Sequence, residues 1–174
     1  MIAAMLKKGG AEGWAQVELD EVYSALPIIS WVQREQSIYR NRKQAVDFLM
    51  MCSDGRQACI ELKVESLFAS AGQGRITMDH RYAQTVREDF FKLQNERIAY
   101  FADLDAYVVA IAFSDEAKKA MAAWLRGNAL NFEHDDVLAY NGEWNISVYV
   151  VPVAGRADAD LDSSRKRSRD AYEG

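Results

Sequence analysis

Three ionisable residues whose types suit metal-assisted hydrolysis lie close together in the chain: Asp47, Glu61 and Lys63. They belong to the segment AVDFLMMCSDGRQACIELKVE, residues 45–65, in which a tight-turn signal joins two apolar runs. Successive side chains of a β-strand point to opposite sides, so Glu61 and Lys63 share one face of a predicted strand. The sequence therefore predicts a carboxylate and an amine side by side on an otherwise buried sheet.

The position of Asp47 relative to this pair depends on the length of the turn. A two-residue loop, Asp54-Gly55, would place Asp47 opposite Leu62 and on the wrong face. A three-residue loop, Ser53-Asp54-Gly55, ends in a left-handed position that glycine supplies, and it places Asp47 opposite Glu61. We predict the three-residue loop. Carboxylates on facing strand positions, with Cβ atoms about 4.5–5.5 Å apart, repel each other unless a positive charge separates them. A divalent cation is the usual solution.

This arrangement resembles the PD-(D/E)XK nuclease superfamily over roughly residues 16–113. Asp47 is followed by thirteen other residues and then by Glu61-Leu62-Lys63 at the end of a hairpin, with a helical region and another apolar strand beyond. In that family the two acids bind magnesium and the lysine orients or polarises the attacking water. The resemblance implies these roles for Asp47, Glu61 and Lys63. Val46 replaces the proline of the motif's name, a departure that is common in the family.

The resemblance also implies a fold, an activity and a cofactor. The expected fold class is α/β, with a central mixed β-sheet flanked by helices in the restriction endonuclease-like αβββαβ core. The expected activity is phosphodiester hydrolysis of nucleic acid, with DNA favoured over RNA. Asp47 and Glu61 would hold Mg²⁺, for which Mn²⁺ can substitute, while water and a phosphate oxygen fill the remaining positions. A homodimer would suit cleavage of both strands of a duplex.

Further acidic and amide residues are candidates for the same site. Many family members carry a glutamate on the first helix, and apolar neighbours at helical spacing would turn Glu18 inward, with Glu21 as its competitor. The alternative is that such a residue only stabilises the helix dipole. Some relatives have a glutamine on the helix after the motif, which makes Gln94 a candidate, although backbone groups can equally satisfy a buried glutamine. Glu65 shares the face of Lys63 and is either a peripheral ligand or its partner.

Two other interpretations stay open. The three charged residues of the hairpin can form a cross-strand cluster of salt bridges, although a sheet covered on both faces is a costly place for charges without a functional partner. The protein can also be a catalytically inactive nuclease-like fold that acts as a protein-interaction or regulatory module. The net charge of −5 favours this second class, because nucleic-acid-binding proteins usually carry a basic surface. Positive charge is nevertheless present locally, at Arg34, Arg40, Arg42, Lys43, Arg75, Arg81, Arg87, Lys92 and Arg97.

Length and composition predict a single soluble domain. The chain has 174 residues, of which 49% are hydrophobic, enough for a substantial core. We assign residues 1–13 to an N-terminal extension, 14–153 to one nuclease-like domain and 154–174 to a disordered polar tail. No apolar run reaches the length of a membrane span, and the first ten residues lack the pattern of a secretory signal. A cytoplasmic protein without membrane contact is expected.

Hydrophobic periodicity predicts the elements that position the candidate residues. Pro27 is expected to kink or break the first helix, Ser114 to cap the third, and Pro152, which lacks an N–H donor, to place the last strand at a sheet edge. The predicted elements in chain order are a helix over 16–36, a short strand over 37–42, hairpin strands over 45–52 and 56–65, a loop over 66–80, a helix over 81–101, a buried strand over 106–113, a helix over 114–126 and a strand over 144–153.

Overall fold

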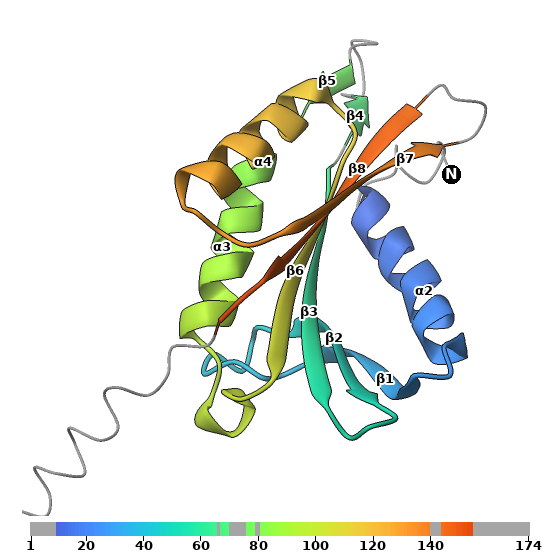
Figure 1. The fold of residues 1–174 in the computed structure, drawn as a ribbon, viewed down its shortest axis with the longest axis vertical. Coiled ribbons are helices and arrows are strands. Elements are labelled where there is room, and N and C mark those ends of the chain that lie inside the picture. The colour runs from blue at the N-terminus through green and yellow to red at the C-terminus, as the bar shows by residue number, and fades with distance from the viewer. Residues whose placement is uncertain (1–9, 66, 70–75, 79–80, 140–143, 155–174) are drawn as a thin grey trace, which may run out of the picture.

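The computed structural model describes residues 10–65, 67–69, 76–78, 81–139 and 144–154. Figure 1 shows their arrangement. The elements in chain order are α2 (Gly10–Ala25), β1 (Ile29–Gln36), β2 (Val46–Cys52), β3 (Gln57–Val64), β4 (Leu67–Ala69), β5 (Ile76–Met78), α3 (Tyr82–Asn95), the 3-10 helix η1 (Ala99–Phe101), β6 (Asp105–Ala112), α4 (Asp115–Gly127), β7 (Glu133–Ala139) and β8 (Trp144–Pro152).

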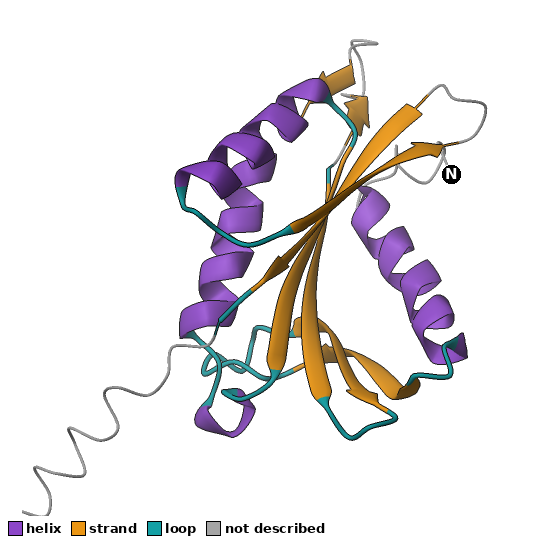
Figure 2. Ribbon diagram, viewed as in Figure 1, coloured by secondary structure: helices purple, strands orange, loops and turns teal. Residues whose placement is uncertain are grey.

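Six of the strands form one mixed sheet in the order β1-β2-β3-β6-β8-β7. Strands β3 and β6 are parallel, and the other neighbouring pairs are antiparallel. Helices α3 and α4 cover one face of this sheet and α2 lies on the other, as Figure 2 shows. The predicted α/β class with a central mixed sheet is confirmed. No helix within the described ranges is both long and apolar enough to cross a membrane.

The core is divided by the sheet into two apolar clusters. The larger cluster packs α3 and α4 against the sheet through residues such as Leu93 and Met121, both fully buried. The smaller cluster packs α2 against β2 and β3, and its buried apolar residues from the described part of α2 are Ala11 and Ala15. Because these side chains are short, the polar residues beside them on α2 also come close to the sheet.

The hairpin of β2 and β3 has the predicted register. Phe48 is paired with Ile60, the backbone N–H of Cys52 donates to the Arg56 carbonyl at 2.7 Å, and Gly55 has a φ of 87°. The three-residue loop Ser53-Asp54-Gly55 is therefore confirmed. The ladder ends at the pair of Phe48 and Ile60, and the same register extended by one residue would bring Asp47 opposite Glu61.

The prediction of one helix over residues 16–36 is wrong. Helix α2 ends at Ala25, and residues 29–36 instead form β1, the edge strand beside β2. Pro27 ends the helix because it lacks an N–H donor and disfavours helical geometry in the residue before it. The β-branched residues that follow, Ile28, Ile29 and Val32, favour a strand. The strand expected over 37–42 is also wrong, since that segment is a loop with one isolated bridge between Tyr39 and Arg97.

The last strand is where it was predicted, but its position in the sheet is not. Strand β8 lies between β6 and β7, and the edge is formed by β7, whose sequence EHDDVLA has no apolar alternation that would have revealed it. Pro152 is tolerated because it is the final residue of β8, paired with Tyr107. A missing N–H donor at a strand end removes no interior rung of the ladder.

The remaining elements are close to their predicted ranges. Strand β6 and helix α4 each lie within one residue of the prediction, and the Ser114 hydroxyl caps α4 by accepting from Ala117 N at 3.1 Å. Helix α3 ends earlier than expected, at Asn95, and β4 and β5 form a small antiparallel ribbon in the segment predicted as a loop. Helix α2 begins inside the expected N-terminal extension. The rest of that extension and the predicted tail beyond residue 154 lie outside the described residues.

Replacement of Gly55 by alanine tests the hairpin geometry. A side chain at a positive φ costs about 1–2 kcal/mol, so Gly55→Ala should lower the free energy of unfolding by that amount. Gly13, inside α2, is the matched control, because a Cβ at this position would meet no atom within 4 Å. Gly13→Ala should raise stability by about 0.5–1 kcal/mol. Urea unfolding of both variants measures these changes, and a neutral Gly55→Ala would contradict the turn assignment.

Candidate functional site

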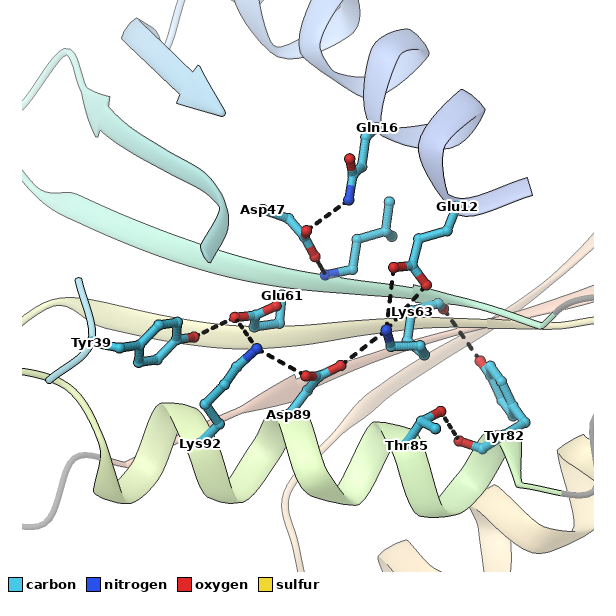
Figure 3. A network of polar contacts seen from close by, with 11 residues as sticks. Glu12, Gln16, Tyr39, Asp47, Glu61, Lys63, Tyr82, Thr85, Asp89 and Lys92 are labelled. Atoms are coloured by element: carbon cyan, nitrogen blue, oxygen red, sulfur yellow. Dashed lines mark hydrogen bonds and ion pairs between the residues drawn. The ribbon is translucent and has the colours of Figure 1, made fainter. Parts of the chain in front are cut away.

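Asp47 lies where strands β2 and β3 separate. The ladder between the two strands is regular from Met51 to Phe48. At the next position the Asp47 side chain makes the hydrogen bond to β3: its Oδ2 accepts from the backbone N–H of Leu62 at 2.7 Å. Its Oδ1 accepts from Gln16 Nε2 on α2 at 2.6 Å. Figure 3 shows these contacts. A side chain thus replaces a backbone rung, and the sheet opens toward α2 at this point.

Glu61 is almost completely buried, with 3% of its surface exposed. Its Oε1 accepts a hydrogen bond from the Tyr39 hydroxyl and lies 2.8 Å from Lys92 Nζ, which comes from α3. The same ammonium group lies 5.0 Å from the centre of the Tyr39 ring. The buried carboxylate is therefore paired with a lysine that is not part of the hairpin motif.

Lys63 is also held between two carboxylates. Its Nζ lies 3.2 Å from Glu12 on α2 and 3.3 Å from Asp89 on α3. Asp89 bridges the two lysines, because its other oxygen is 3.0 Å from Lys92 Nζ. Acidic and basic groups alternate along this chain of contacts, as Figure 3 shows. We call the six ionisable residues Glu12, Asp47, Glu61, Lys63, Asp89 and Lys92 the charge cluster.

Burial and mutual repulsion shift the pKa values of the acids in the charge cluster upward. Burial, followed by the charge of Asp47, raises the pKa of Glu61 to about 8, against the opposing effect of Lys92. Burial raises the pKa of Asp47 to about 6, although the hydrogen bond from Leu62 N lowers it. Four acids and two lysines give the cluster a formal charge of −2 when all are ionised. Removing so much negative charge from water is costly unless cations compensate it.

The lysine pKa values are shifted in the direction that keeps both ammonium groups charged. Burial opposes the charged form of Lys63, but the carboxylates of Asp89 and Glu12 outweigh it and raise the pKa. The pKa of Lys92 is raised in the same way by Glu61 and Asp89 against the effect of burial. Both side chains are therefore hydrogen-bond donors at neutral pH.

Asp47, Glu61 and Lys63 are near enough for their charges to affect one another, although no hydrogen bond or ion pair among the described residues joins Asp47 to the other two, and the predicted helix residues are not part of the cluster. Glu18 and Glu21 are exposed on α2, and Gln94 is half-buried on α3. Within the described ranges, none of the three has a hydrogen bond or ion pair to the charge cluster. Glu12 takes the place expected for Glu18. These two residues lie about 120° apart around the helix axis, at 3.6 residues per turn.

The contributions of α3 to the site were missed from the sequence. Asp89 continues the spacing of the buried residues Tyr82, Val86 and Leu93, so a carboxylate stands within the apolar stripe of the helix. This break in an apolar pattern is the signal that identifies it. Lys92 lies one turn further on, adjacent to Asp89 on the same side of the helix.

Glu65 has a different role from either that the sequence suggested. The carboxylate is 1% exposed and accepts from Phe113 N at 2.7 Å and from Ser114 N at 2.8 Å. It also accepts from the Ser114 hydroxyl at 2.5 Å. These hydrogen bonds therefore link the end of β3 to the turn between β6 and α4.

Asp47 and Glu61 suit a magnesium ion by the type of their ligand atoms. Mg²⁺ is usually held by one or two carboxylates and completes its shell with water and phosphate oxygens. When all six residues are ionised, which the pKa of Glu61 sets at about pH 8 and above, a divalent cation would offset the charge of −2. Among the described residues, no group of three or more His, Cys, Asp or Glu side chains is arranged to hold a metal ion. Lys92 occupies Glu61 Oε1, so a metal bound there would displace it.

Comparison of the chain with protein-family models, with curated proteins and with solved structures finds no match.

The raised pKa of Glu61 predicts how stability depends on pH. The pKa is about 8 in the folded chain and near 4.5 ordinarily, so the folded state binds more protons between these values and stability falls as pH rises through this window. Glu61→Gln should remove this contribution. Its free energy of unfolding, relative to wild type, should rise by more than about 1 kcal/mol between pH 5 and pH 8, since one pKa unit corresponds to about 1.4 kcal/mol.

Urea unfolding at pH 5, 6.5 and 8 measures this difference. Glu18→Gln is the control because Glu18 is exposed, and it should follow the wild-type curve. Parallel curves for wild type and Glu61→Gln would contradict the assignment.

Proposed function

We propose that the protein is a metal-dependent nuclease that hydrolyses phosphodiester bonds of nucleic acid, with DNA favoured over RNA, at a PD-(D/E)XK-type site. The proposal is supported by the hairpin, whose register leads Asp47 toward Glu61, and by Lys63, which lies in the same half-buried cluster with an excess of acids. Asp47 and Glu61 would hold Mg²⁺ or Mn²⁺.

The order of the elements around the site supports this proposal. Apart from the short β4–β5 ribbon, the series α2, β1, β2, β3, α3 and β6 follows the αβββαβ order expected of such a core. The hairpin strands are central in the sheet, and helices from both faces, α2 and α3, contribute side chains to the same cluster. Side chains from the helices on both faces of the sheet therefore contact the hairpin motif.

The charge cluster suggests a role for each side chain. A metal bound there would lower the pKa of the attacking water and stabilise negative charge on the phosphate. Gln16 holds the Asp47 carboxylate in one orientation through its hydrogen bond. Lys63 stays protonated because Asp89 and Glu12 raise its pKa. It therefore donates hydrogen bonds that orient water and offset developing charge, and it does not act as a general base.

Two observations favour the second candidate, a catalytically inactive nuclease-like module that binds another protein. Lys92 is 2.8 Å from Glu61, so a protein cation already partly compensates the carboxylate that a metal would need. An apolar groove of about 220 Å³ beside α2 offers a surface for a protein partner. It is lined by Ala11, Trp14, Ala15, Val64, Ile111, Phe113, Val137, Ile146 and Val148.

Cleavage assays distinguish the two candidates. The purified protein is incubated with single-stranded, duplex and branched DNA and with RNA, in Mg²⁺, Mn²⁺ or EDTA. We expect cleavage that EDTA suppresses, and a loss of at least about 100-fold in Lys63→Met, in line with the size of typical electrostatic contributions to catalysis. Lys118→Met on α4 is the matched control and should retain full activity.

Circular dichroism and thermal unfolding test whether Lys63→Met is folded. An absence of EDTA-sensitive cleavage on every substrate would favour the inactive module. Unfolding of Lys63→Met, with wild type also inactive, would identify the charge cluster as structural.

A further inference from the structure

The loop between β1 and β2 is a concentrated strip of positive charge on an acidic protein. Residues 37–45 read SIYRNRKQA and contain Arg40, Arg42 and Lys43 but no acidic residue, whereas the whole chain has a net charge of −5. We propose that this loop, which we call the basic loop, binds the sugar–phosphate backbone of a nucleic acid. The inference rests on the proposed function and names the surface that would hold its substrate.

The basic loop is fixed to the rest of the protein at its first residues. Ile38 and Tyr39 are buried, with 0% and 2% of their surfaces exposed. Ile98 N donates to the Ile38 carbonyl and Arg40 N donates to the Glu96 carbonyl, both at 2.9 Å. These bonds hold the loop against the end of α3 and the turn that follows it. A preorganised loop loses little conformational freedom when it binds a ligand.

The second half of the loop is a turn closed by Asn41. The backbone N–H of Gln44 donates to the Asn41 carbonyl at 2.9 Å, and that of Lys43 donates to the Asn41 side-chain oxygen at 3.1 Å. Arg40, Arg42 and Lys43 are all exposed. The turn therefore presents these cations to solvent from a defined backbone.

The three cations of the basic loop are available for phosphate. Within the part of the chain that the structure describes, none of Arg40, Arg42 and Lys43 forms an ion pair with a carboxylate. Lys63 and Lys92, in contrast, are already paired inside the charge cluster. Arginine also matches phosphate with two parallel hydrogen bonds. Binding of a polyanion by the loop breaks no existing ion pair among the described residues.

The basic loop also leads directly to the charge cluster. Tyr39 immediately precedes Arg40, and its hydroxyl donates to Glu61. A nucleic-acid strand held by the loop would therefore lie on the side of the charge cluster that Tyr39 and Glu61 form.

A second basic surface on the protein serves as a comparison. Helix α4 carries Lys118, Lys119 and Arg126 along a groove of about 400 Å³, but Asp115 and Asp136 line the same groove. Lys118 also donates to the Asn145 carbonyl at 2.6 Å. This surface also carries three cations, but acids lie among them. Removing its three cations therefore changes the charge of the protein as much as removing those of the basic loop, which makes it a matched control.

Fluorescence anisotropy with labelled single-stranded and duplex DNA tests the proposal, in EDTA so that nothing is cut and over a range of KCl concentrations. The variant Arg40→Ala/Arg42→Ala/Lys43→Ala should bind at least tenfold more weakly at low salt. Log affinity falls as log salt concentration rises, and the magnitude of this slope should be smaller in the variant by about two to three, since each phosphate contact contributes about 0.7–0.9. The control variant Lys118→Ala/Lys119→Ala/Arg126→Ala should stay within twofold of wild type.

The outcomes separate this inference from the proposed function. Equal affinity and salt slope for the loop variant and wild type would overturn the inference, and so would an equal loss in the control variant or no DNA binding by wild type. DNA binding that depends on the loop, in a protein that cuts no substrate, would support the inference and contradict only the nuclease activity. Cleavage by wild type with unchanged DNA binding in the loop variant would contradict only the inference.

Discussion

The ion pair between the buried Glu61 carboxylate and Lys92 is the contact on which the rest of the site depends. A carboxylate removed from water must gain hydrogen bonds and an opposite charge, or it becomes protonated. Glu61 gains a hydrogen bond from Tyr39 in the loop after β1 and an opposite charge from Lys92 on α3, but burial still raises its pKa to about 8. Lys92 in turn needs Asp89, and Asp89 also reaches Lys63. The position of α3 on the sheet is thus coupled to the charges of the hairpin.

The site forms where side chains from the helices on the two faces of the sheet approach each other. Strands β2 and β3 separate at Asp47, which replaces a backbone rung with its own carboxylate. Through this opening α2 contributes Gln16 and Glu12, while α3 approaches from the other face. The result is a cluster with more acids than lysines, in which Glu61 is buried and the other five members are half-buried. Metal-dependent hydrolysis is the function that we propose for this arrangement.

The parts of the site that depend on local rules were predictable from the sequence. Alternation along a strand and the turn at Gly55 set the register of the hairpin, because both follow from a few neighbouring residues. The helix contributions depend on where a helix starts and which side packs on the sheet, and these are tertiary properties. Sequence periodicity pointed to Glu18, whereas α2 begins at Gly10 and turns Glu12 toward the sheet. The edge strand β7 was missed because its acidic sequence carries no alternating pattern.

A crystal structure of the protein grown with Mn²⁺, with data collected at the manganese absorption edge, tests metal binding by the charge cluster most directly. We expect an anomalous peak in contact with carboxylate oxygens of both Asp47 and Glu61, and a Lys92 side chain that has left Glu61 and kept its contact with Asp89. Saturating Mn²⁺ with no peak at these carboxylates, and with Lys92 still on Glu61, would contradict the metal site.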